Sequence, residues 1–120
     1  MKKSTKTKKK IDPQVVQIVH SRAQGYCEVC GRVLGSEGAL HHRKLRSRGG
    51  EHTASNLIYV HHECHNLGTD SIHSNPAYAA EKGWMVGSWQ KPEESPFTKP
   101  DHSIVLLHND GSVSVLMEGD

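Results

Sequence analysis

The sequence predicts a small α+β domain built from short strands and short helices. Short apolar runs flank a basic loop in the middle of the chain, and two more flank an Asp-Gly pair near its end. Only 34% of the 120 residues are hydrophobic, which is enough for one small core. Three cysteines cannot complete a set of disulfides, but together with ten histidines they can ligate a metal. A core this small often needs a disulfide or a bound metal ion to stabilise the fold; such a stabilising metal is called a staple below.

Charge is distributed unevenly along the chain. Residues 1–48 hold 12 lysines and arginines and 3 acidic residues, whereas residues 49–120 hold 3 and 10. Residues 1–11 are predicted to form a disordered basic tail. The basic first half favours a polyanionic partner such as nucleic acid, and a lysine tail that only improves solubility is the alternative.

A first helix is predicted to follow this tail. Asp12 is a good N-cap, Pro13 suits the first turn, and Gly25 ends the helix. Its apolar residues lie at helical spacing, so we expect it to pack behind the functional site. Arg22 near its end is interpreted as a solvated side chain, with a phosphate contact as the alternative.

The centre of the chain predicts a ββα unit. Residues 39–42 and 57–60 read as strands joined by a long basic loop, and a helix is expected to begin near His62. We assign residues 12–90 to one domain. Residues 91–120 are expected to form a proline-containing linker and a C-terminal β-hairpin around Asp110-Gly111, which packs on the domain or extends it.

Four residues have the spacing of a structural zinc site. Zinc takes four nitrogen or sulfur ligands, commonly in pairs two to four residues apart. Two such pairs are present, and they comprise Cys27 with Cys30 and His61 with Cys64. His62 is the competing imidazole, but it lies closer to Cys64 in sequence than the usual pairing.

A second metal site is predicted from the remaining histidines. Adjacent side chains on a helix diverge by about 100°, so Cys64 and His65 rarely serve one ion. His65 can therefore pair with His41 or His42 in a site that keeps open positions for water and substrate. The alternative is a zinc-stapled module in which these three histidines are ordinary surface or packing residues.

Taken together, these motifs resemble the HNH endonuclease family in its cysteine-containing, zinc-stapled phage and bacterial form. The matching elements are Cys27/Cys30, His41-His42, Gly49-Gly50, Asn56-Leu57 and Cys64-His65. The resemblance covers roughly residues 22–73, and the family usually has cysteine where this chain has His61. It implies a ββα-metal (His-Me finger) core stapled by a structural zinc, with flanking helices.

The resemblance also implies roles for individual residues. His42 corresponds to the general base, and His41 and His65 to ligands of a catalytic divalent ion (Mg²⁺, Mn²⁺, Ni²⁺ or Zn²⁺). Asn56 corresponds to the residue that bonds to the loop backbone and holds His42. We infer four phosphate contacts on the basic loop, namely Arg43, Lys44, Arg46 and Arg48. No role is assigned to His52, His62 or His73, which are expected to be exposed or secondary.

The implied activity is metal-dependent hydrolysis of DNA phosphodiester bonds, by nicking or cutting, with low intrinsic sequence specificity and 5′-phosphate and 3′-hydroxyl products. A phage terminase or another packaging protein is a candidate partner beside DNA. Because no apolar leader or membrane-spanning run is found, we expect a cytoplasmic location in a bacterial host cell and no membrane partner. The alternative function is a non-catalytic, zinc-stapled nucleic-acid-binding module.

Overall fold

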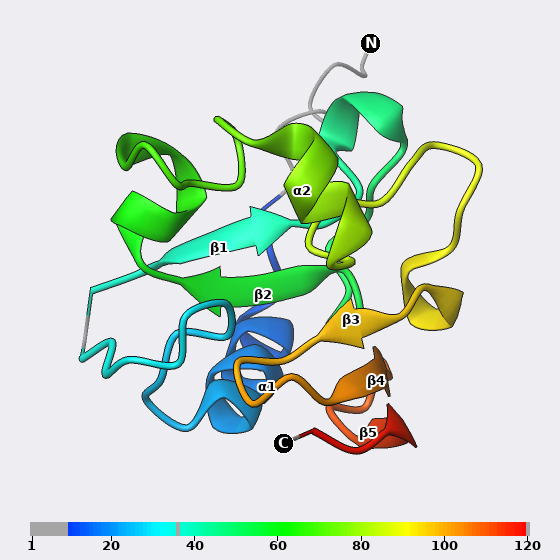
Figure 1. Ribbon diagram of the computed structural model, residues 1–120. Coiled ribbons are helices and arrows are strands. Elements are labelled where there is room, and N and C mark those ends of the chain that lie inside the picture. The colour runs from blue at the N-terminus through cyan, green and yellow to red at the C-terminus, as the bar shows by residue number, and fades with distance from the viewer. Residues whose placement is uncertain (1–9, 36, 120) are drawn as a thin grey trace, which may run out of the picture.

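The computed structural model describes residues 10–35 and 37–119 (Figure 1). Nearly all of the predicted basic tail, residues 1–9, therefore lies outside the described residues. The helices and strands are α1 (Pro13–Ala23), β1 (Ala39–His42), β2 (Leu57–Val60), α2 (Pro76–Glu81), β3 (Phe97–Thr98), β4 (Ile104–Leu107) and β5 (Val113–Met117). This mixture of helices and antiparallel strands confirms the predicted α+β class.

Helix α1 begins where the sequence predicts. The Asp12 side chain accepts a hydrogen bond from the backbone N–H of Gln14 at 2.8 Å, and Pro13 occupies the first turn. The expectation that Arg22 is solvated is wrong, because its side chain is only 6% exposed and pairs with Glu28 at 2.7 Å. Arg22 also donates to the carbonyls of Ala54 and Leu57, and so ties α1 to the start of β2.

Strands β1 and β2 pair antiparallel and carry the middle of the molecule. Ala39 faces Val60 and His42 faces Leu57, and every residue of β2 is buried. Both strands have the bounds that the sequence predicts. Figure 1 shows the pair between α1 on one side and α2 on the other.

The segment after β2 is shorter and wider than the α-helix expected there. Glu63–Leu67 forms one π-helical turn, closed by the Gly68 N–H on the Glu63 carbonyl at 3.0 Å. The chain then doubles back on this turn, because Ile72 N–H bonds to the Cys64 carbonyl and His73 N–H to the His65 carbonyl. This reversal brings residue 73 beside residue 65.

The last part of the chain forms a second sheet in the order β3-β4-β5, all antiparallel. Phe97, Val105 and Leu107 are buried in one cluster with residues of α1 and β2. The turn between β4 and β5 approaches α1 so closely that a Cβ on Gly111 would lie 2.8 Å from Ile18 Cγ2. The segment predicted as an irregular linker supplies β3 to this sheet.

Candidate metal centres and catalytic site

Three cysteines and one histidine gather into a first cluster. The ligand atoms of Cys27, Cys30, His61 and Cys64 all lie within 4.8 Å of one another. Nδ1 of His61 is 3.3 Å from the Cys30 sulfur and 3.9 Å from the Cys64 sulfur. Four soft and borderline donors in one such group match the ligand set of a structural zinc.

His61 is oriented for this role by the backbone. Its Nε2 lies 2.9 Å from the Val33 carbonyl oxygen. Because a carbonyl can only accept, Nε2 carries the proton, and the lone pair of Nδ1 is directed at the thiols. His62 is exposed and lies outside the cluster, so the group that could hold a metal includes His61 rather than His62.

The electrostatics of the cysteines also favour a bound cation. Burial, and then the neighbouring Cys27 and Cys30, raise the pKa of Cys64 to about 12. Burial raises the pKa of Cys30 as well, but hydrogen bonds from Arg32 outweigh it and bring that pKa down to about 6. The raised pKa of Cys64 reflects the cost of placing a further negative charge beside these sulfurs, and a cation bound between them would offset that cost.

A second cluster consists of His41, His65 and His73, whose ligand nitrogens also lie within 4.8 Å of one another. His41 is 1% exposed and donates from Nε2 to the Trp84 carbonyl at 2.8 Å. Its buried Nδ1 has no hydrogen-bond partner among the described residues. A buried acceptor left without a partner costs about 1–3 kcal/mol, and a coordinated cation would satisfy it.

Burial keeps this second cluster ready to ligate. Desolvation first, and then the charges of the neighbouring histidines, lower the pKa of His41 to about 3. The pKa of His65 is lowered by the same causes in the same order. Both rings are therefore neutral at pH 7, which is the form that binds a metal.

His73 is a site residue that the sequence reasoning missed. Its Nε2 lies 3.1 Å from Nε2 of His65, and its ring is edge-on to that of His41 at 5.3 Å between centroids. His73 is exposed, as expected, but it belongs to a group that could hold a metal ion, a role that the sequence analysis did not assign. Eight residues separate it from His65, and only the chain reversal after Gly68 joins them, so spacing alone gave no signal.

His42 lies beside this cluster, half-buried at the end of β1. Its Nε2 is 3.0 Å from Nδ1 of His52. Burial first, and then the charges of His52, Arg46 and His65, lower the pKa of His42 to about 4. The ring is thus neutral at pH 7 and able to accept a proton.

Asn56 is fully buried and closes the basic loop. Its Oδ1 accepts from Lys44 N–H at 2.7 Å, and its Nδ2 donates to the carbonyls of Lys44 and Glu51 at 3.1 and 2.9 Å. The two ends of the loop approach closely at Gly50, where a Cβ would lie 1.7 Å from the Lys44 oxygen. Asn56 therefore fixes the loop through its backbone.

The four cations predicted to contact phosphate fall into two groups. Arg46 and Arg48 are exposed on a 3-10 turn, and Lys44 is half-buried with Nζ 3.1 Å from the Gln90 carbonyl. Arg43 is 0% exposed and bonds only to backbone carbonyls, so its prediction as a phosphate contact is wrong. The strand alternation that buries His41 buries Arg43 as well.

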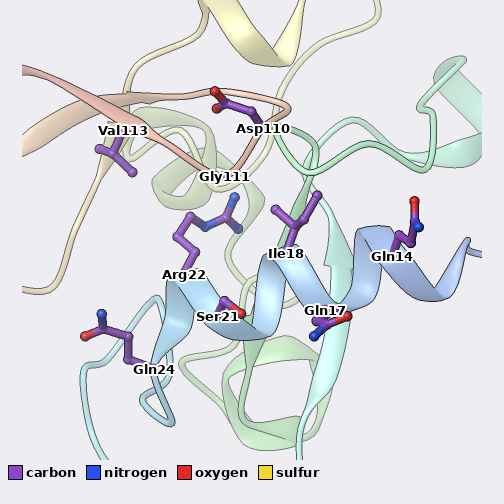
Figure 2. Close-up of a pocket in the computed structure, with 9 residues that line it drawn as sticks. All are labelled: Gln14, Gln17, Ile18, Ser21, Arg22, Gln24, Asp110, Gly111 and Val113. Carbon is purple, nitrogen blue, oxygen red and sulfur yellow. The ribbon is translucent and has the colours of Figure 1, made fainter.

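A broad hollow on the described surface lies away from both clusters. It measures about 730 Å³ and opens between α1 and the turn from Asp110 to Val113 (Figure 2). Glutamines, Ser21 and Arg22 supply most of its polar lining, and no cysteine or histidine reaches it. In the described part of the chain, no helix is long and apolar enough to cross a membrane.

Comparison with known proteins identifies the class of the central segment. Residues 27–71 match the family model described as HNH endonuclease, which confirms the expected family for this part of the chain. The matched segment contains strands β1 and β2 and the residues Cys27, Cys30, His61, Cys64 and His65. Because members of this family are usually nucleases, the match supports a general nuclease function on nucleic acid. His73 lies just beyond it. No curated protein and no solved structure matches the chain.

Proposed function

We propose that this protein is a metal-dependent endonuclease that hydrolyses phosphodiester bonds in DNA, nicking or cutting with low intrinsic sequence specificity. One observation carries the proposal. A half-buried, neutral His42 stands beside an open cluster of three imidazoles, and a separate cysteine cluster serves as the staple. A binding module would need the staple, but it would have no use for the second cluster.

Two metals have separate roles in this proposal. A zinc ion held by Cys27, Cys30, His61 and Cys64 would stabilise a ββα-metal core made of β1, β2 and the π-helical turn. His41, His65 and His73 would hold the second ion, and three imidazoles suit Ni²⁺ or Zn²⁺ better than Mg²⁺ or Mn²⁺. A divalent ion bound there supplies Lewis-acid stabilisation of charge on the phosphate and on the departing 3′-oxygen.

The remaining residues bind and orient. His42 would take a proton from the water that attacks phosphorus. The bond from phosphorus to the 3′-oxygen would break and that oxygen would take up a proton from solvent, which leaves 5′-phosphate and 3′-hydroxyl ends. Asn56 would keep the loop in the conformation that presents His42. Arg46 and Arg48, with Lys44 beside them, would contact the phosphate backbone without reading sequence. A phage terminase in the host cytoplasm is the partner we propose from the family resemblance.

A plasmid-relaxation assay with added Mg²⁺, Mn²⁺, Ni²⁺ or chelator tests this proposal. We expect metal-dependent nicking that falls by about 10²–10⁴-fold in His42→Ala, because a general base contributes that much. His62→Ala is the matched control, since His62 is exposed and outside both clusters. If DNA binds but no metal gives cleavage, the protein is the non-catalytic, zinc-stapled binding module instead.

A further inference from the structure

We propose that His52 is a positioning residue of this site, which accepts the Nε2 proton of His42 and so leaves Nδ1 of His42 to take the proton from water. The inference rests on the proposed function of His42 as the base. It adds a residue that neither the family match nor the spacing of the motifs assigns.

The geometry of the two rings supports a hydrogen bond rather than simple packing. Nε2 of His42 and Nδ1 of His52 are 3.0 Å apart. The ring planes are tilted by 51° with centroids 5.1 Å apart, so the rings are not stacked and meet through these nitrogens. A hydrogen bond between these two nitrogens requires one proton, carried by one ring or the other.

Only one position of that proton leaves His42 able to work as a base. If His52 donated, the Nε2 lone pair of His42 would be engaged and its own proton would sit on Nδ1, so neither nitrogen could accept another. If His42 donates from Nε2, its Nδ1 keeps a lone pair. His52 would thus select the tautomer of His42, as a carboxylate or carbonyl does for other catalytic histidines.

The loop contacts explain how His52 reaches this position. The side chain of Asn56 bonds to Lys44 at one end of the loop and to the carbonyl of Glu51 at the other. Glu51 directly precedes His52, so Asn56 sets where the His52 backbone lies. Asn56 would therefore hold His42 indirectly, through Glu51 and His52.

Nitrogen NMR of the zinc-loaded full chain with ¹⁵N-labelled histidine tests the inference without requiring cleavage. The ring signals of His42 are identified by their loss in His42→Ala. We expect the parent to show His42 protonated on Nε2, His52→Ala to show mixed tautomers, and His52→Asn to restore the parent form through its amide oxygen. His62→Ala should leave the His42 signals unchanged.

Two results overturn the inference, namely a parent His42 protonated on Nδ1, or an unchanged tautomer in His52→Ala. Cleavage kinetics give the second measurement. We expect His52→Ala to lower kcat by at least about 10-fold with KM within about 2-fold, and His52→Asn to recover most of the rate. If the parent does not cleave but the tautomer still follows residue 52, the proposed function fails and the positioning role stands.

Discussion

Replacing Arg43 by methionine should unfold the domain rather than weaken its hold on DNA. Arg43 is the largest of the fully buried side chains. It donates to four backbone carbonyls, and these belong to Gly83, Ser55, Pro92 and Ser95, at 2.8, 2.8, 3.1 and 2.8 Å. One guanidinium therefore joins the lead into β2, the end of α2 and the segment before β3.

No carboxylate neutralises Arg43 among the described residues, where Arg22–Glu28 is the ion pair that forms. Burial, and then the charge of Arg22, lower the pKa of Arg43 to about 9, so the side chain is still charged at pH 7. The carbonyl dipoles and the ring of Phe97, 5.4 Å from the guanidinium carbon, must compensate for its desolvation.

The expected cost follows from these contacts. Methionine fills much of the same volume but donates nothing, so the carbonyls lose their partner at about 1–3 kcal/mol each. Four such carbonyls cost more together than the several kcal/mol that relief of the buried charge returns, which leaves a net loss on the order of 3–5 kcal/mol. In a domain of this size, about 1 kcal/mol moves Tm by roughly 4–8 °C, so we expect Tm to fall by at least about 10 °C.

Thermal and urea unfolding of the zinc-loaded protein would measure this loss, with Arg48→Met as the matched control. Arg48 is exposed, so its variant should keep the parent Tm. That variant should instead bind DNA more weakly. The slope of log binding constant against log salt concentration should be shallower, by about the amount that one phosphate contact contributes. The reasoning is refuted if Arg43→Met keeps the parent Tm and shows the loss of affinity that we assign to Arg48.

Three further predictions concern the two clusters. Cys27→Ser should lower both zinc content and the Tm of the whole domain rather than slow cleavage selectively; an unchanged Tm with full zinc content would reject the staple. His73→Ala should weaken Mn²⁺ or Ni²⁺ binding in calorimetry by about 10-fold or more, whereas His62→Ala should not. Without added divalent ion, His41 alone should lower the free energy of unfolding by about 2 kcal/mol between pH 7.5 and 5, because its pKa is about 3 when folded and 6.5 when unfolded. This stability is present above pH 6.5 and is lost as pH falls toward 3, so in urea unfolding His41→Asn should show a weaker dependence.

Features encoded by neighbouring residues were predictable from the sequence. The N-cap at Asp12, the apolar run of β2 and the spacing of Cys27 and Cys30 are local, and the structure shows each of them. The histidine beside Cys64 was also assigned to a different site from sequence alone, because adjacent side chains on a helical turn diverge.

Residues whose role depends on distant segments were not predictable in this way. Arg43 stands in a run of cations, which normally indicates a solvated loop, and its carbonyl partners are 12 to 52 residues away in sequence. Its burial could be inferred only by extending the alternation of β1 past His42. His52 and His73 were not assigned to the site for the same reason. Loop closure by Asn56 brings His52 to the site and the chain reversal after Gly68 brings His73 there, and neither contact is local in sequence.

The π-helical turn is where the two clusters become one structure. Cys64 and His65 are adjacent, yet the first belongs to the cysteine cluster and the second to the histidine cluster. The backbone carbonyls of these same two residues accept hydrogen bonds from the N–H groups of Ile72 and His73, so the segment that carries His73 is held against the turn. Any interaction that holds Cys64 in place therefore also holds the rings of His65 and His73 in place. A five-residue turn has too few internal hydrogen bonds to hold that geometry alone, so a metal ion bound by the cysteine cluster would have a direct part in shaping the second site.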